Sequence, residues 1–299
     1  MTGTAMRYDI GLRITYSYDS PAATGRHLLR VMPAHLPGEQ QLITGCLDIE
    51  PRVTERSDRT DFFGNGTVEV AHRSAHAEIE FRVRARVERL ARAPEFDISP
   101  TLDRLAHEIA GQQSLDPASP HHCLGPSARV RLDPALTGYG RDQVHAGMST
   151  LEAVRAIGLA LNRDMRFDPE ATTVDTPAEE AFANRHGVCQ DFTHVMIASL
   201  RGLGVPAGYV SGYLRTRPPE GRPRLEGADA MHAWVRAWCG VETGWVEYDP
   251  TNALMVGAEH IVIARGRDYS DVAPVKGILR TAGSQTTEQH VDVIPLDAF

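Results

Sequence analysis

Hydrophobic and polar residues alternate along much of the first ninety positions of the chain. One run has an apolar or aromatic residue at every second position, namely Tyr8, Ile10, Leu12, Ile14, Tyr16 and Tyr18. A later run over 76–90 does the same, with Arg82, Arg84 and Arg86 on the opposite face. Between them, residues 61–72 predict a hairpin around Asn65-Gly66. A period of two is that of a half-buried strand, so residues 6 to about 90 are predicted to be all-β.

The spacing changes to that of helices after Ser99-Pro100, where a helix is predicted to begin. Ser149 and Glu152 form a capping-box sequence for a second helix, and Thr176-Pro177 begins a short third one. Residues 112–148 are rich in loop-forming residues, and 207–214 is the next predicted strand. The order indicates an α+β fold, with a β-sandwich-like domain over 1–92 and an α+β domain over 93–299 whose antiparallel sheet packs on helices.

Composition and charge limit the classes of partner. The chain has 31 Lys and Arg against 39 Asp and Glu, a net charge of −8. This balance disfavours nucleic acid and an anionic membrane surface as partners. No run approaches the roughly 20 apolar residues of a membrane helix, and the first residues do not resemble a signal peptide. With four widely spaced cysteines and no CxxC pair, the expected location is the reduced cytoplasm.

Cys189 stands in the first turn of a predicted helix whose apolar residues run from Phe192 to Leu203. The unpaired N–H groups and the positive dipole at a helix N-terminus stabilise a thiolate and can bind an oxyanion. Three interpretations compete for this residue: a buried filler, one arm of a metal site, or a nucleophile.

The segment 229–252 supplies possible partners for Cys189. If its two alternating runs form a bulge-free hairpin centred on Gly240-Val241, directly opposed residues have numbers that sum to 481. His232 then lies across from Asp249 on one face, within reach of a side-chain hydrogen bond. An imidazole oriented by a carboxylate beside a helix-terminal cysteine favours a nucleophile–base–orienter arrangement over a core histidine satisfied by an aspartate. A bulge at 239–243 would break this register.

Neighbouring residues allow two interpretations each. The Gln190 side chain could donate to an oxyanion or be structural, and Trp234, with Trp238, could line a substrate groove or cover the sheet. Asp191 is expected to cap the helix and point away from the sulfur, and His194 is expected to be structural. The Arg-rich loop over 215–229 suggests a carboxylate-bearing substrate, or simple solvation.

Cys189, His232 and Asp249 are all possible zinc ligands, and the run His121-His122-Cys123 adds three more. Neither set has the short paired spacing of structural zinc sites, and no acidic calcium loop is present. We therefore expect no metal and no other cofactor.

Three segments resemble the core of bacterial transglutaminase-like proteins, which belong to the papain-like cysteine enzymes: "GVCQDFTHVMIASLRGLGVPAGYVSGYL", "DAMHAWVRAWC" and "GWVEYDPTNAL". The β-rich start and "IARGRDYSDVAPVKG" at 263–277 resemble the domain before this core and its C-terminal signature. The resemblance implies that Cys189 is the nucleophile, His232 the general base and acid, and Asp249 the orienter, with Tyr269 and Asp271 near the cleft.

The implied activity is acyl transfer at amide or peptide bonds, either hydrolysis by a peptidase or amidase, or aminolysis by a protein-glutamine or peptide acyltransferase. The competing function is a non-catalytic binding or scaffold module on the same fold. The acyl donor, the acceptor and the oligomeric state are left open by the sequence.

Overall fold

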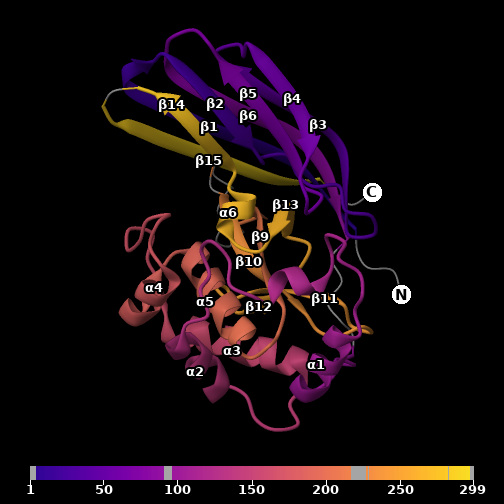
Figure 1. Cartoon of the computed structure of the whole chain (residues 1–299). Coiled ribbons are helices and arrows are strands. Elements are labelled where there is room, and N and C mark those ends of the chain that lie inside the picture. The colour runs from indigo at the N-terminus through magenta and orange to yellow at the C-terminus, as the bar shows by residue number, and fades with distance from the viewer. Residues whose placement is uncertain (1–4, 91–95, 217–226, 228, 282, 297–299) are drawn as a thin grey trace, which may run out of the picture.

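The structure is a computed structural model that describes residues 5–90, 96–216, 227, 229–281 and 283–296. Two stacked β-sheets form one end of the molecule, and a unit of helices and a five-stranded sheet forms the other (Figure 1). The expected α+β fold, with a β-rich N-terminal region and helices in the core, is confirmed. None of the described helices is long and apolar enough to cross a membrane.

The first sheet has the strand order β15-β1-β6-β3 and the second has the order β14-β2-β5-β4. Six strands come from the N-terminal region: β1 (Met6–Ala22), β2 (Thr24–Leu29), β3 (Gln40–Glu50), β4 (Glu55–Thr60), β5 (Gly66–His72) and β6 (His76–Arg89). The inward residues of the alternating runs, such as Tyr8, Leu12 and Phe81, are buried. Arg84 and Arg86 point outward and form ion pairs with Asp48 and Asp9.

The last two strands of the chain return to this sandwich. β14 (Val275–Arg280) pairs with β2, and β15 (Gln285–Leu296) pairs with β1 along twelve positions. A single cut into 1–92 and 93–299 therefore misplaces residues 275–296, because a strand joins whichever sheet edge it can pair with, however distant in sequence. The predicted boundary itself falls in 91–95, outside the described residues.

Local predictions differ from the structure at three places. The β4–β5 hairpin turns over 61–65, because Thr60 pairs with Gly66, so its first arm lies earlier in the chain than expected. Helix α1 (Leu102–Ala110) begins after Thr101 rather than Ser99. The region 112–148 also contains η1 (Pro120–Cys123) and a helix, α2 (Pro134–Asp142), capped by the Asp133 side chain.

The second unit is built around one helix and one antiparallel sheet of order β12-β11-β10-β9-β13. The sheet strands are β9 (Ala207–Leu214), β10 (Ala230–Trp238), β11 (Trp245–Asp249), β12 (Leu254–Met255) and β13 (His260–Gly266). The helices are α3 (Thr150–Asp164), α4 (Ala178–Asn184), α5 (Cys189–Gly202) and α6 (Tyr269–Val272), with a short parallel pair β7 (Arg166–Phe167) and β8 (His186–Gly187). The capping box predicted at Ser149 and Glu152 is confirmed.

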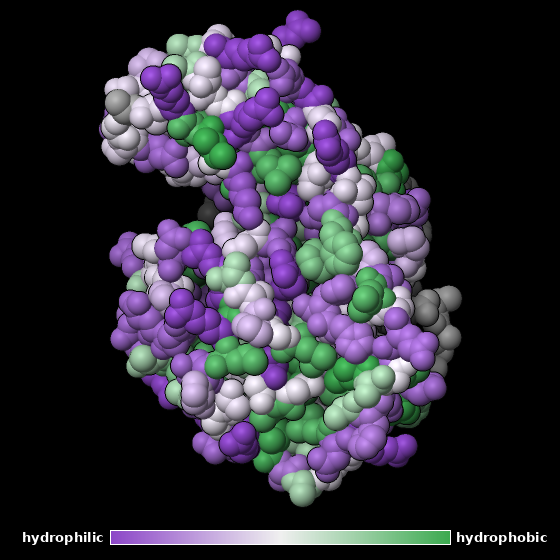
Figure 2. Space-filling view, in the orientation of Figure 1, coloured by the Kyte–Doolittle hydropathy of each residue, from purple (hydrophilic) through white to green (hydrophobic). Residues whose placement is uncertain are grey.

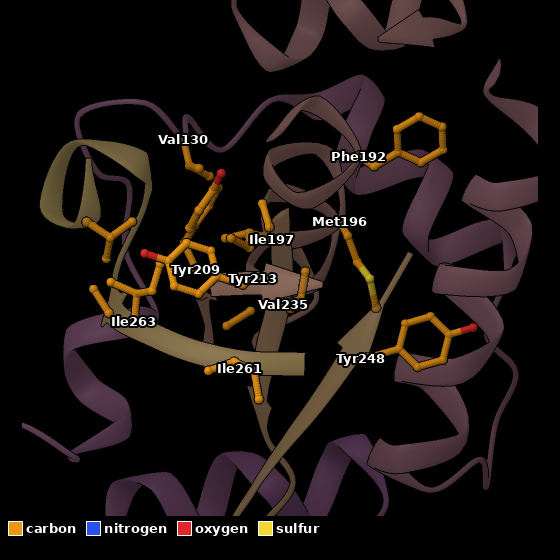
Figure 3. Packing of buried hydrophobic residues seen from close by; sticks show 14 of the residues in the cluster. Val130, Phe192, Met196, Ile197, Tyr209, Tyr213, Val235, Tyr248, Ile261 and Ile263 are labelled. Carbon is orange, nitrogen blue, oxygen red and sulfur yellow. The ribbon is translucent and has the colours of Figure 1, made fainter. Parts of the chain in front are cut away.

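Helix α5 is the centre of this unit. Residues 190–201 are all buried, because α2, α3 and α4 cover the side of α5 that the sheet leaves free. Met196 and Ile197 of α5 lie against Val235 and Tyr248 of the sheet in the close view of the core (Figure 3). The first turn of α5 is thereby held rigidly at the edge of the packed core.

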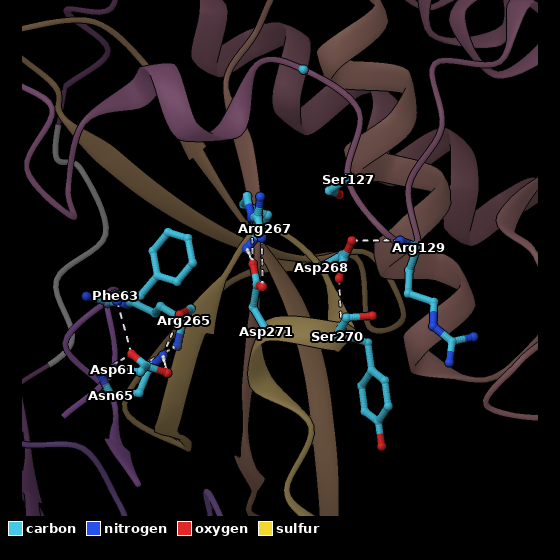
Figure 4. Close-up of polar contacts among 12 residues, drawn as sticks. Asp61, Phe63, Asn65, Ser127, Arg129, Arg265, Arg267, Asp268, Ser270 and Asp271 are labelled. Carbon is cyan, nitrogen blue, oxygen red and sulfur yellow. Dashed lines mark hydrogen bonds and ion pairs between the residues drawn. The ribbon is translucent and has the colours of Figure 1, made fainter. Parts of the chain in front are cut away.

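The two units are joined through side chains that bind backbone. Asn65, in the β4–β5 turn, donates to the carbonyl of Arg265 at 2.8 Å and accepts from its N–H at 2.8 Å (Figure 4). On the face shown in Figure 2, the surface is hollowed by a notch between the β14–β15 end of the sandwich and the helical unit. Of the Arg-rich loop, residues 217–226 lie outside the described residues, and Arg215 pairs with Glu259.

Candidate active site

The N-terminus of α5 is shaped by the residues just before and after Cys189. The Asp191 carboxylate accepts from the Val188 N–H at 2.8 Å and from the Thr172 hydroxyl at 2.6 Å. Asp191 therefore caps its own helix, as expected, and burial raises the pKa of its carboxyl group. A Cβ on Gly187 would lie 2.5 Å from Asp191 Oδ2, so only glycine fits this close approach.

Cys189 is the first residue of α5 and its side chain is partly exposed. The first N–H groups of a helix have no intrahelical partner, so those of Cys189 and Gln190 face outward from the helix end. The other thiols differ in setting. Cys123 and Cys239 are buried, and burial raises the pKa of both, that of Cys239 to about 12.

His232 connects Cys189 to Asp249. Its Nε2–H donates to Asp249 Oδ2 at 2.7 Å, and the nearby Cys189 side chain contributes to raising the pKa of the ring. Because Nε2 is engaged by the carboxylate, Nδ1 is the ring nitrogen left for the thiol. The structure thus brings together the three residues that the sequence singled out.

The strand register that predicted this contact is nevertheless wrong. Arg236 pairs with Glu247 and Trp238 with Trp245, so opposed residues sum to 483 rather than 481. The turn over 239–244 is longer than a two-residue turn, and Gly240 and Gly244 adopt positive φ there. A shift by two residues keeps every side chain on its face, and His232 reaches Asp249 diagonally instead of directly across.

The fully buried Asp249 carboxylate is held by more groups than the sequence indicated. Oδ2 also accepts from His260 Nε2 at 3.1 Å and from the Asn252 amide at 2.7 Å, and Oδ1 accepts from the Thr251 N–H at 2.9 Å. Asn252 lies in the Asp-Pro-Thr-Asn turn that follows β11. The sequence of this turn is typical of an Asx turn, so its contact with Asp249 was predictable from the sequence. His260 is on β13, which no local signal connects to β11.

These contacts set the charges of the site. Burial lowers the pKa of His232, but its hydrogen bonds to Asp249 and Cys189 outweigh burial and raise the pKa to about 10. Burial raises the pKa of Asp249, yet hydrogen bonds from His232 and His260 bring it well below its usual range. The geometry therefore favours a His232 imidazolium paired with the Asp249 carboxylate and lying close to the Cys189 side chain.

The three residues considered for substrate contact have different positions. Gln190 is buried, and its amide donates to the Val174 carbonyl at 3.0 Å. Trp234 is fully buried, with Nε1 donating to Glu247 at 2.9 Å, so it covers the sheet and does not line an open groove. Tyr269 is partly exposed, and the Cys189 charge is one cause of its raised pKa, after burial and other neighbouring charges.

His194 fixes the position of Tyr269. Its Nε2 accepts from the Tyr269 N–H at 3.2 Å, and its ring lies 5.1 Å from the ring of Tyr209. Burial lowers the pKa of His194 to about 4, so the ring is neutral and able to accept. The expected structural role of His194 therefore has a geometric basis, which is to hold α6 beside the start of α5.

Neither metal set from the sequence forms a cluster of ligand atoms in the described chain. The His121 and His122 Nε2 atoms bind backbone carbonyls of Gln112 and Leu115. The group that does converge is His232, Asp249 and His260. Its nitrogens lie 2.7 and 3.1 Å from one carboxylate oxygen, distances of hydrogen bonds and shorter than the about 3.3 Å between ligands of a tetrahedral zinc. The absence of a metal stays a prediction.

Comparisons with known proteins agree with this fold. Residues 137–250 match the transglutaminase-like superfamily, and residues 8–88 match the bacterial transglutaminase-like N-terminal region. An uncharacterized protein of Mycobacterium tuberculosis (strain H37Rv) is 31% identical, over 95% of this chain and 88% of its own. One of Mycobacterium leprae is 29% identical, over 94% and 96%.

A solved structure has the same fold over nearly the whole chain. The crystal structure of a candidate cysteine protease from Cytophaga hutchinsonii superposes with a TM-score of 0.73 at 21% identity, covering 99% of this chain and 92% of that one. At this identity the likeness concerns the fold alone.

Proposed function

Because this chain belongs to the transglutaminase-like superfamily, we propose that it is a cysteine-dependent acyl-transfer enzyme acting on amide or peptide bonds. Cys189 is the nucleophile, His232 the general base and acid, and Asp249 the residue that orients His232. The observation that carries this proposal is the His232 ring held between the Asp249 carboxylate and the Cys189 side chain, at the exposed end of a buried helix.

The reaction proceeds through a thioester. The Cys189 thiolate attacks the substrate carbonyl carbon, and the resulting oxyanion lies by the free N–H groups of the first turn of α5. The His232 imidazolium gives its proton to the leaving amine as the C–N bond breaks. A water molecule or a second amine then attacks the thioester, His232 accepts its proton, and the thiolate leaves.

Both outcomes of the second step fit the same residues. Attack by water makes the protein a peptidase or amidase, and attack by an amine makes it a protein-glutamine or peptide acyltransferase. The alternative function is a binding or scaffold module without turnover. The alternative is disfavoured by the contact of His232 with the partly exposed thiol, because a scaffold has no need of an activated cysteine.

The proposal is tested first by alkylation with iodoacetamide at mildly acidic pH, using intact mass and peptide mapping. Cys189 is expected to react faster than an ordinary thiol, and His232→Ala is expected to slow it to the ordinary rate. Incubation with peptide and amide libraries should then leave an acyl group on Cys189 that mass spectrometry identifies. If alkylation is slow and insensitive to His232→Ala, the scaffold function is the correct one.

We infer that the protein works in the cytoplasm on a peptide or amide substrate, with neither nucleic acid nor membrane as a partner. All four cysteines are free, which suits a reducing compartment. The acidic balance of the chain disfavours polyanions. Cell fractionation with an antibody to the protein tests the location directly.

A further inference from the structure

A cavity of about 800 Å³ opens between the sandwich and the sheet of the second unit. Strands β10 and β11 form its floor, and Glu39 and Arg89 of the sandwich form part of its wall. None of the three proposed catalytic residues lines it. It is therefore a separate site from the one that holds the nucleophile.

The lining of this cavity carries three guanidinium groups and three carboxylates, but they are not paired one to one. Arg265 forms ion pairs with Glu39 and Glu247, and Arg89 lies 3.9 and 3.7 Å from the same two carboxylates. Arg236 also lines the cavity and has no ion pair with any described residue. Three guanidinium groups thus share two carboxylates. Glu242 on the exposed turn also lines the cavity but does not pair with Arg236.

Arg236 is unpaired because its natural partner is occupied. Glu247 is directly across the ladder from Arg236, on the same face of the sheet. Its Oε1 accepts from Arg265 at 3.0 Å and its Oε2 accepts from Trp234 at 2.9 Å. With these groups around Glu247, the Arg236 guanidinium lies instead over the ring of Trp245, 4.0 Å from its centre.

The Arg236 side chain is half-buried, and part of its guanidinium is removed from water. Its Nε is buried without a hydrogen-bond partner in the described part of the chain. Burial, together with the neighbouring Arg265, lowers the pKa of Arg236 to about 10. A half-buried cation without a counterion has lost part of its hydration, and an anion entering the cavity compensates for that loss.

Most of the remaining lining residues are apolar. Phe96, Ile98, Val246 and Met255 face the same cavity as the guanidinium and the Trp245 ring. From this combination we propose that the cavity is a binding site for a small organic anion, a carboxylate carried on an apolar or aromatic body. The carboxylate pairs with Arg236, and the body lies against Trp245 and the apolar wall.

Isothermal titration calorimetry with phenylbutyrate and its uncharged counterpart phenylbutyramide tests the proposal. The wild type should bind the carboxylate saturably and about 10- to 100-fold more tightly than the amide, the range expected of a charged hydrogen bond. Arg236→Met should abolish this preference, and Arg84→Met, which removes a surface arginine of the sandwich, should leave it intact. Cys189→Ser should bind like the wild type, so the result is independent of whether the proposed acyl transfer occurs.

Two results overturn the proposal. One is a wild type that binds phenylbutyrate no better than the amide, in which case water alone solvates Arg236. The other is an Arg236→Met protein that keeps the preference for the carboxylate. If Arg236→Met does not fold, Arg236→Lys, which retains a cation, must still prefer phenylbutyrate to phenylbutyramide, with weaker affinity. Phenylbutyrate must also raise the melting temperature of the wild type more than phenylbutyramide does.

Discussion

Replacing Asp249 with asparagine removes one negative charge and leaves the shape of the side chain. The amide oxygen is still able to accept from the ring of His232, so the change isolates the charge from the geometry. In the wild type the pKa of His232 is raised from 6.5 to about 10, which corresponds to about 5 kcal/mol in favour of the imidazolium. Asp249 and Cys189 share this effect against the opposing cost of burial. Losing the contribution of the Asp249 charge therefore lowers the pKa of His232 in Asp249→Asn below its wild-type value.

The measurement is an NMR titration of histidine Cε1 signals, with His232 identified among the 13 histidines by the spectrum of His232→Gln. Cys189→Ser is the matched control, because it replaces the other side chain that raises the pKa of His232 and leaves Asp249 in place. The reasoning is refuted if His232 of the wild type titrates near its ordinary pKa, or if Asp249→Asn leaves its titration unchanged.

The same change affects stability in a defined pH window. The raised pKa of His232 stabilises the fold fully below pH 6.5, and this contribution is lost as the pH rises through about 10. The lowered pKa of Asp249 stabilises the fold at pH values above the ordinary pKa of an aspartate. This contribution is lost as the pH falls below that ordinary pKa. The free energy of unfolding of Asp249→Asn should therefore differ most from that of the wild type at about pH 4–6.5, and chemical denaturation at several pH values measures this difference.

Three further results are expected. His260→Gln removes a hydrogen bond to the buried Asp249 carboxylate, so it should lower the free energy of unfolding by about 1.5–3 kcal/mol and shift acid unfolding to higher pH. An unchanged midpoint of acid unfolding would contradict this role of His260. Gly187→Ala places a Cβ against Asp191 and should lower the free energy of unfolding, measured by urea denaturation, by about 1–3 kcal/mol. An unchanged urea midpoint would mean that the backbone at the start of α5 moves to accommodate the methyl group. Peptide mapping after brief alkylation of the native protein should find label on Cys189 well before the two buried cysteines, and equal labelling would contradict the burial of those thiols.

Periodic segments were predictable from the sequence. The alternation of β1 and β6 and the helical spacing of α5 each arise from one face packed against the core, so the pattern reports burial directly. Helix α2 was missed because two glycines, Gly138 and Gly140, interrupt a short and weakly apolar run. Strand β15 was missed because most of its residues are exposed and only its pairing with β1 makes it a strand.

The contact of His232 with Asp249 was predicted from an incorrect register. It was still found because the register error is an even number of residues, which leaves both side chains on the same face of the sheet. A hairpin with a longer turn moved the pairing by two residues, which exchanges direct neighbours for diagonal ones on the same face. A shift by one residue would have separated the two side chains. Local alternation was thus sufficient for His232 and Asp249, whereas His260 depends on a strand crossover that no local pattern encodes.

The sandwich contributes to the site through the strand that carries His260. Strand β13 is the edge of its sheet, and an unpaired edge needs partners for its backbone. The buried Gln40 side chain supplies them, donating to the Val262 carbonyl at 2.8 Å and accepting from its N–H at 2.9 Å, while Arg89 donates to the His260 carbonyl at 3.0 Å. Because His260 in turn binds Asp249, the first unit holds one end of the chain of hydrogen bonds that joins His260 and Asp249 to His232. The β-rich region is therefore part of the framework of the candidate active site, to which it is joined through buried side chains.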